Sequence, residues 1–240
     1  MNRIRYYVKR IPIISYPYYF FRYLLNNSIP NYKLSKVKQK GSNSVLLSSN
    51  FLNPNRIVLG DYVIVNSSNH FITNNKNIII KKYTSVSSDC IIVSHNHIPT
   101  VGIPQSISNS EHINDVENEV IIEEDVWIGA GSILLHKCHI GRGAVIGAGS
   151  VITKPVPPYA VVVGNPQRII ASKFSLEQIL KHETSLYPPE ERMTVEELKE
   201  LFENYYSGMP SIGVDSYPEE DYQTLLKVRK EMGVADYSEV

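Results

Sequence analysis

An aliphatic residue recurs at every sixth position through the middle of this chain, and few folds are compatible with that spacing. The repeat runs without a break through Ile122, Ile128, Leu134, Ile140, Ile146 and Ile152. A small or β-branched residue follows four positions after each of the first five: Val126, Ser132, Cys138, Ala144 and Ser150. A period of six fits neither an amphipathic helix, which repeats about every 3.6 residues, nor an alternating strand. It predicts a coil with flat sides, in which each unit forms one short parallel strand and one corner.

The same spacing occurs earlier in the chain. The large apolar positions are Leu59, Val65 and Phe71, then Ile80, Val86 and Ile92, and the small positions are Val63, Asn69, Thr84 and Cys90. Three units complete one triangular coil, and stacked coils hydrogen-bond at a strand spacing of about 4.8 Å. We therefore predict an all-β core, a parallel β-helix over residues 42–170. Cys90 and Cys138 both take the small position, which predicts buried structural thiols and no disulfide framework.

Between Ile92 and Ile122 the repeat stops, which predicts a loop over residues 95–119 that projects from the column. A loop of this length in a compact domain is usually functional or disordered. It opens with the stretch SHNHIP, in which His95 and His97 stand two residues apart. From the residues alone, this pair is a metal site, a catalytic base or part of a polar loop.

The first segment of the chain, residues 1–41, is basic and rich in aromatic residues. Residues 1–40 carry nine Lys and Arg and no acidic residue. Pro12, Pro17 and Arg22 interrupt its apolar run, and no small-residue cleavage site follows, so we predict a cytoplasmic protein without a signal peptide. Weak association of this segment with an anionic membrane surface is the alternative.

The last segment, residues 171–240, is acidic and is predicted to be helical. It carries fifteen acidic residues against seven basic ones. The capping-box pattern occurs three times, at Ser175 with Gln178, Thr194 with Glu197, and Ser216 with Glu219. Since these helices follow the repeat, we expect the tail to be dispensable for folding of the column.

The stretch DVWIGAGSILLHKCHIGRGAVIGAGSVITKPVPPYAVVVGNPQRII, residues 125–170, resembles the hexapeptide-repeat acyltransferases. Among these it is similar to the galactoside, maltose and nodulation-factor, streptogramin, and capsule or lipopolysaccharide sugar O-acetyltransferases. The resemblance implies a left-handed parallel β-helix that uses acetyl-CoA as co-substrate and holds no metal. It also implies a homotrimer with active sites between subunits, and a saccharide or related small molecule as the acceptor.

In this family the catalytic histidine follows Thr, Ser, Gly or Asn at the start of an extended loop. Ser94 and His95 take that position, so the resemblance implies that His95 is the general base. A neutral histidine can accept the proton of an attacking hydroxyl near pH 7. The resemblance assigns His97 and Trp127 to the acceptor or acetyl-group pocket, with His97 as the rival base. Trp127 precedes an inward residue and should point outward.

The cofactor contacts implied by the resemblance come from the last coils. They are Gly131, Ser132, Ala148, Gly149, Thr153, Lys154 and Arg168. Lys154 and Arg168 match the basic positions that hold the phosphates of coenzyme A, which need cations or backbone amides. The outward apolar residues Trp127 and Val145 should be covered by neighbouring subunits.

Two other functions stay open. The β-helical zinc carbonic anhydrases share the expected fold and bind zinc through three histidines from neighbouring subunits, so His95 and His97 leave a zinc protein as an alternative. The other is an N-acetyltransferase that acts on an amino sugar. The sequence contains no P-loop, no complete dinucleotide-binding motif and no nucleic-acid-binding module, so no nucleic-acid partner is expected.

Overall fold

The computed structural model describes residues 36–47, 50–232, 234, 236 and 237, together with the single positions 17 and 20. The basic segment 1–41 therefore lies almost entirely outside the described residues, and so does its expected association with a membrane surface. No helix in the described part of the chain is long and apolar enough to span a bilayer.

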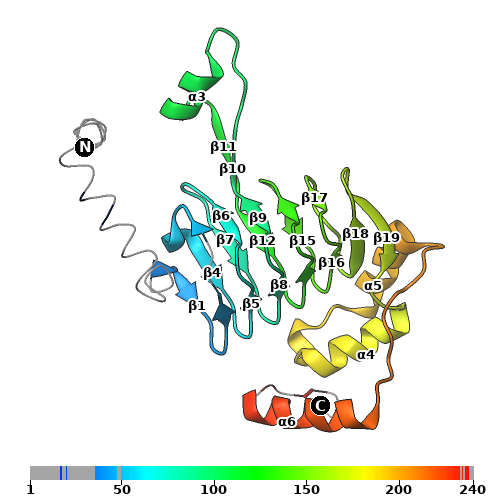
Figure 1. Ribbon diagram of the computed structural model, residues 1–240. Helices are drawn as coiled ribbons and strands as arrows, with labels where there is room; N and C mark the ends of the chain where they lie inside the picture. The colour runs from blue at the N-terminus through cyan, green and yellow to red at the C-terminus, as the bar shows by residue number, and fades with distance from the viewer. Residues whose placement is uncertain are drawn as a thin grey trace.

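Short parallel strands stack into three sheets, which form the three faces of a column (Figure 1). Sheet A contains β1 (Gln39–Lys40), β4 (Ile57–Leu59), β7 (Ile78–Ile80), β12 (Val120–Ile122) and β15 (His139–Ile140). Sheet B contains β2 (Val45–Leu46), β5 (Ile64–Val65), β8 (Ser85–Val86), β13 (Trp127–Ile128), β16 (Val145–Ile146), β18 (Ala160–Val163) and β19 (Arg168–Ser172). Sheet C contains β3 (Asn50–Phe51), β6 (His70–Ile72), β9 (Ile91–Val93), β14 (Ile133–Leu134) and β17 (Val151–Ile152). The chain visits the three sheets in turn, which confirms the predicted left-handed parallel β-helix.

The side chains of the repeat fill the inside of the column. Every large apolar repeat position from Leu59 to Ile152 is at most 1% exposed. Each of these side chains contributes about 1.5–3 kcal/mol by leaving water. The small positions are buried as well, including Cys90 and Cys138, which are free thiols as expected. Burial raises the pKa of the Cys138 thiol to about 11, so it stays protonated and unreactive at neutral pH.

The corners of the coils share one construction. The small residue of each unit points inward. The turn is made by the residue before it, which takes a positive φ at Asp125 (55°), Lys137 (71°) and Gly131 (68°). The small residue is required because its side chain shares the narrow interior with the aliphatic positions of the same coil.

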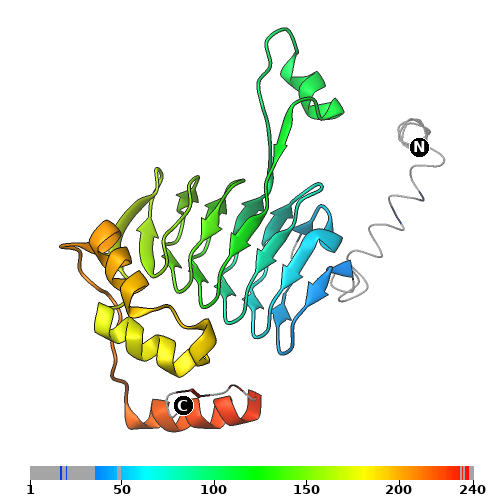
Figure 2. The same cartoon turned by 180° about the vertical axis from the view of Figure 1, so that it is seen from behind.

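The break in the repeat is an ordered arm, where the sequence predicts an irregular loop. Strands β10 (His95–His97) and β11 (Asp115–Glu117) pair as an antiparallel hairpin, with helix α3 (Gln105–Glu111) near its tip. The arm, residues 95–117, rises from the middle of the column in both views (Figures 1 and 2). At its base the Ser94 hydroxyl donates to Thr73 Oγ1 at 2.7 Å, and the Asn118 amide donates to the Ser94 carbonyl at 2.9 Å.

The tail is helical, as predicted, and two of its three expected capping boxes are present. The elements are α4 (Leu176–Leu186), η3 (Pro189–Glu191), α5 (Val195–Leu201), η4 (Phe202–Tyr206) and α6 (Glu219–Met232). Ser175 and Thr194 cap α4 and α5 in the expected way. The third box is wrong, because Glu219 is the first residue of α6 and Pro218 lies directly before it. Ser216 is therefore too far from the helix to cap it.

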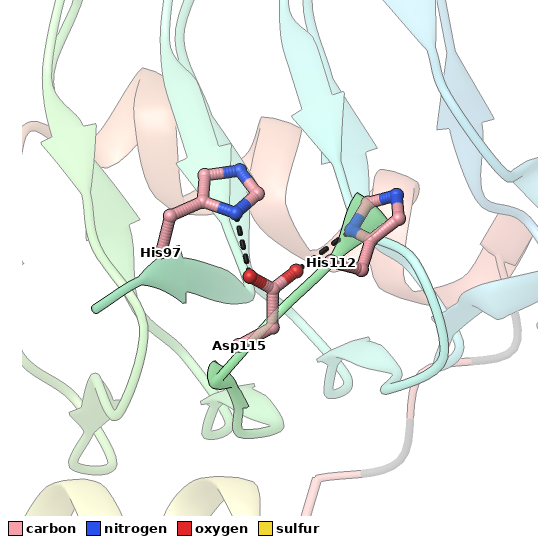
Figure 3. Close-up of side chains that lie close together, drawn as sticks. All are labelled: His97, His112 and Asp115. Carbon is pink, nitrogen blue, oxygen red and sulfur yellow. Dashed lines mark hydrogen bonds and ion pairs between the residues drawn. The ribbon is translucent and has the colours of Figure 1, made fainter. Parts of the chain in front are cut away.

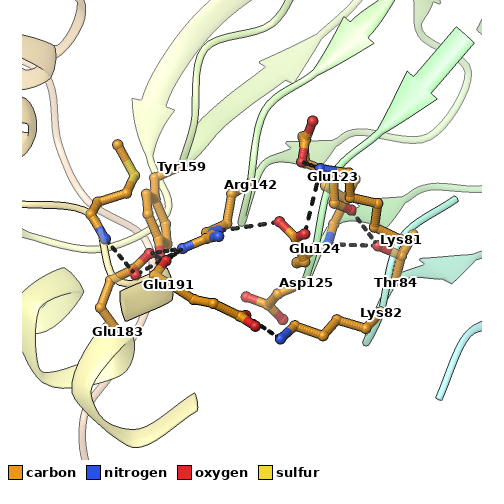
Figure 4. Close-up of polar contacts among 12 residues, drawn as sticks. Lys81, Lys82, Thr84, Glu123, Glu124, Asp125, Arg142, Tyr159, Glu183 and Glu191 are labelled. Carbon is orange, nitrogen blue, oxygen red and sulfur yellow. Dashed lines mark hydrogen bonds and ion pairs between the residues drawn. The ribbon is translucent and has the colours of Figure 1, made fainter. Parts of the chain in front are cut away.

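The first half of the tail closes the end of the column, which argues against the expectation that the tail is dispensable. Ile179 and Leu198 are fully buried in the same core cluster as Tyr159, which belongs to the last coil. The Tyr159 hydroxyl donates to Glu183 Oε1 at 2.5 Å, and Glu183 Oε2 lies 3.0 Å from Arg142 Nη1 (Figure 4). Burial raises the pKa of Tyr159, so this hydroxyl remains a donor. Residues through Tyr206 therefore belong to the folded core.

Candidate active site

Two imidazoles lie on the first strand of the arm, and one of them is held by a carboxylate. His97 faces Asp115 in the register of the hairpin, and His97 Nδ1 lies 2.6 Å from Asp115 Oδ1 (Figure 3). Burial acts to raise the pKa of Asp115, but hydrogen bonds from His112 and His97 outweigh it and lower that pKa. Asp115 is thus a carboxylate, which only accepts hydrogen bonds, so His97 donates from Nδ1, and the neutral form of this ring has its lone pair on Nε2.

His95 has a different environment. Its side chain is half-buried, and among the described residues its buried Nδ1 has no hydrogen-bond partner. Burial lowers the pKa of His95, and the neighbouring His97 imidazole lowers it further, so the ring is neutral at neutral pH. The two rings meet edge to face with centroids 5.4 Å apart. His95 therefore packs against His97, and no group in the described part of the chain fixes its tautomer.

Trp127 lies on the outer face of sheet B, as expected, with 54% of its surface exposed. Through the strand register, Val45 and Ile64 occupy the same outer face and are 44% and 45% exposed. Val45, Ile64 and Trp127 form what we call the apolar strip. The arm leaves the column after a strand of sheet C, so one chain presents the histidines and the strip on different faces.

Val145 does not belong to this exposed surface. It follows Trp127 in the register of sheet B, but it is only 7% exposed, because it packs with Val161 and Ala171. The expectation that another subunit must cover Val145 is therefore wrong. The returning strand β19, which carries Ala171, completes that part of the surface within the chain.

Three of the expected cofactor residues lie along one open corner of the column, between sheets B and C. Gly131, Ala148 and Gly149 are exposed there. Gly131 and Gly149 both have a φ of 68°, and among the described residues, chain neighbours aside, no atom lies within 4 Å of the position that a Cβ would take. Ser132 differs, because it is fully buried and its hydroxyl donates to the Gly129 carbonyl at 2.7 Å. The hydroxyl of Ser132 is therefore not exposed at this corner, where a coenzyme could approach only its backbone.

The remaining cofactor residues lie on two segments that Gln167 joins. Its side-chain oxygen accepts hydrogen bonds from the amides of Thr153, at 2.7 Å, and Lys154, at 3.0 Å. Arg168 follows directly in the chain. Lys154 and Arg168 are both exposed, and within the described part of the chain neither forms an ion pair with a carboxylate. The structure thus presents two uncompensated cations at this end of the column.

A separate hollow of about 430 Å³ lies outside sheet A, away from the arm. Its cations are already neutralised, as Figure 4 shows. Lys81 lies 2.5 Å from Glu123 Oε2, Lys82 pairs with Glu191, and Arg142 lies 3.3 Å from Glu124 Oε2. This hollow therefore holds a structural ion-pair network that joins the tail to the column, and its described lining residues offer no unpaired cation to a phosphate.

The sequence analysis identified neither Asp115 nor His112 as a site residue. In the structure, Asp115 Oδ2 also lies 2.7 Å from His112 Nδ1, so one carboxylate contacts two imidazoles. Asp115 stands 18 residues after His97. They become neighbours only through the register of the hairpin. This register could not be predicted, because the segment that contains both residues has no repeat.

Comparison with known proteins agrees with the fold. Residues 119–154 match the family model of the bacterial transferase hexapeptide (six repeats). A stretch of 59 residues is 48% identical to chloramphenicol acetyltransferase of Klebsiella aerogenes, covering 25% of this chain and 28% of that protein. The chain thus spans little more than a quarter of the length of this curated relative.

Solved structures match over a longer part of the chain. A maltose O-acetyltransferase from Clostridium difficile superposes with a TM-score of 0.54 and 27% identity, over 62% of this chain and 80% of that one. A galactoside acetyltransferase in complex with coenzyme A superposes with a TM-score of 0.55 and 20% identity, over 72% and 84%. With its repeat, its three parallel sheets and these matches, the chain has the left-handed parallel β-helix fold of hexapeptide-repeat proteins and is similar to hexapeptide-repeat acetyltransferases.

Proposed function

We propose that the protein transfers an acetyl group from acetyl-CoA to a small acceptor, with a saccharide hydroxyl as the preferred class and an amino-sugar nitrogen as the alternative. The single observation that carries this proposal is the hydrogen bond between His97 and Asp115 at the base of the arm. It supplies an oriented imidazole on a column whose relatives are acetyltransferases. We therefore propose His97 as the general base. The sequence position directly after Ser94 favoured His95 for this role.

The reaction needs one group that both takes and returns a proton. The acceptor oxygen attacks the thioester carbonyl, and its proton passes to His97 Nε2. The tetrahedral intermediate collapses with cleavage of the carbon–sulfur bond, and the imidazolium returns the proton to the departing thiolate. Asp115 holds the ring in place and stabilises the imidazolium formed on the way. His95, which packs edge-on against His97, is proposed to shape the acceptor or acetyl pocket.

Coenzyme A is proposed to lie along the open corner at Gly131, Ala148 and Gly149, where no side chain prevents close approach of the pantetheine arm. Its phosphates would then lie near Lys154 and Arg168. The Thr153 amide already donates to Gln167, so the proposed contribution of Thr153 is limited to its side chain.

Replacing Lys154 or Arg168 by alanine should raise the KM for acetyl-CoA about 10- to 100-fold, with a smaller change in kcat. A charged hydrogen bond contributes about 1.5–3 kcal/mol, and a phosphate contact holds the ground and transition states about equally. Steady-state kinetics with acetyl-CoA and acetyl-3′-dephospho-CoA checks this. A variant that loses affinity equally for both donors does not recognise the 3′-phosphate.

We further propose that the active site forms between subunits of a homotrimer, because one chain places His97 and Trp127 on different faces of the column and leaves the apolar strip exposed. Ile64→Glu should place three charges in the interface and yield monomers in multi-angle light scattering. The control is Val228→Glu on α6, which is similarly exposed at 40% and should leave the trimer intact. A stable wild-type monomer at micromolar concentration contradicts the shared site.

An acceptor screen tests the activity. Purified protein is incubated with acetyl-CoA and single members of a panel of sugars, sugar nucleotides, amino sugars and chloramphenicol, and release of the coenzyme thiol is followed. We expect thiol release that depends on one acceptor class and is lost in His97→Ala. Thiol release that is independent of acceptor would indicate thioester hydrolysis and would sink the proposal.

A further inference from the structure

A second imidazole shares the carboxylate that holds the proposed base. His112 Nδ1 lies 2.7 Å from Asp115 Oδ2, on the side opposite to His97 (Figure 3). His112 takes a left-handed conformation at the C-terminal end of α3, with a φ of 56°, and this turn directs its ring back toward β11. The proposed proton transfer uses only His97 and Asp115. It gives no reason for a third residue at the same carboxylate.

The three side chains form a donor set that suits a transition metal. One nitrogen from each histidine and one oxygen of Asp115 all lie within 4.8 Å of one another. Two imidazole nitrogens and one carboxylate oxygen, with a fourth position left open, are characteristic ligands of Zn²⁺. The Asp115 side chain is 8% exposed and His97 22%, so a bound ion would be partly shielded from water.

We propose that His97, His112 and Asp115 bind Zn²⁺ or a chemically similar divalent ion, and that the bound ion switches off acetyl transfer. Binding itself follows from the three ligands alone. The inhibition rests on the proposed function, because it requires His97 to be the base.

The geometry permits the ion with a small movement. Tetrahedral zinc has bonds of about 2.0–2.2 Å, which places its ligand atoms about 3.3–3.6 Å apart. The two Nδ1–O separations are 2.6 and 2.7 Å, because hydrogen-bond protons now occupy the space between them. Each separation must therefore widen by about 1 Å or less. The His112 side chain is 57% exposed, so it can make this movement.

Inhibition follows from where the proton of His97 can reside. In the hydrogen-bonded arrangement, Nδ1 carries the proton and Nε2 carries the lone pair that accepts the acceptor's proton. An ion bound at Nδ1 uses the lone pair of that nitrogen, so the ring proton must move to Nε2. His97 then has no free lone pair, and base catalysis stops while the rest of the site is unchanged.

The binding test uses untagged full-length protein that has been freed of metal with a chelator. Zn²⁺ is titrated by calorimetry, and Co²⁺ is titrated while its visible absorption is recorded. We expect one ion per chain and the intense absorption of tetrahedral cobalt. His112→Ala should raise the Kd for Zn²⁺ at least about tenfold, since even loss of an outer-shell partner costs 10- to 100-fold. His70→Ala, an exposed histidine of sheet C, is the control and should bind as the wild type does.

Activity measurements test separately whether the bound ion inhibits acetyl transfer. Zn²⁺ should inhibit acetyl transfer by the wild type, and the chelator should restore it. His112→Ala in metal-free buffer should keep its activity and resist the same Zn²⁺ concentration. Wild type that binds no ion, or His112→Ala that binds equally well, overturns the site. Stoichiometric binding at the arm without inhibition refutes the switch. Because the cobalt spectrum needs no acceptor, the site remains testable even if the proposed acetyl transfer fails.

Discussion

His97→Ala should reduce the turnover number for acetyl transfer by about 10²- to 10⁴-fold, equivalent to about 3–5 kcal/mol of transition-state stabilisation. The reason is that Nδ1 of His97 is fixed by Asp115 at 2.6 Å, which leaves Nε2 as an oriented proton acceptor. The Kd for acetyl-CoA, measured by calorimetry, should change little, since His97 lies on the arm and the proposed coenzyme contacts lie on the column. Turnover is measured at saturating concentrations of both substrates.

Two further variants test whether turnover depends on the orientation of the His97 imidazole by Asp115 or only on the presence of an imidazole. Asp115→Asn keeps the size of the side chain but removes its charge, so it should lower turnover by a smaller factor than His97→Ala. His95→Ala should cost less than either, because no carboxylate orients His95 in the described part of the chain. A larger loss in His95→Ala than in His97→Ala, with stability unchanged in both, would return the base to His95.

Truncation after Ala171 should leave a chain that does not fold into a stable column. The tail contributes four nearly inaccessible side chains that pack against the column: Ile179, Tyr187, Leu198 and Tyr206. At about 1.5–3 kcal/mol each, their loss removes about 6–12 kcal/mol, which is comparable with the total stability of a typical domain. Thermal unfolding followed by circular dichroism measures the effect.

A shorter truncation and a point variant serve as controls. Truncation after Gly213 removes α6, most of whose residues are exposed, and should keep a cooperative transition close to that of the full chain. Glu183→Ala removes the acceptor for both Tyr159 and Arg142 and should destabilise the protein by about 3–5 kcal/mol. If the chain truncated after Ala171 melts at the wild-type temperature, the tail is an appendage after all.

The column could be predicted from the sequence because the place of a residue in the six-residue repeat determines whether its side chain points inward or outward. In a coil of three six-residue units, the spacing alone determines that residues such as Ile128 and Leu134 point inward and that Trp127 points outward. The caps at Ser175 and Thr194 were predictable for the same reason, since a capping box is a contact within four residues.

What the sequence did not predict depends on contacts between distant residues. The pairing of His97 with Asp115 requires a hairpin register, and the segment between them has no period from which to read it. The burial of Val145 requires the chain to return as β19, and the role of Glu183 requires α4 to dock on Tyr159. In each of these contacts the two residues lie far apart in the sequence, and the local sequence pattern around one does not predict its contact with the other.

Mass analysis of the acceptor tests the central claim most directly. Wild type and His97→Ala, at equal concentration and with the same acetyl-CoA, are incubated with the acceptor class that the thiol-release screen identifies, and the products are resolved by mass spectrometry. The account predicts an acetylated acceptor, formed in step with coenzyme release by the wild type and at least about a hundredfold more slowly by His97→Ala. Equal product formation by both proteins, or no acetylated product from any hydroxyl or amine, would contradict it.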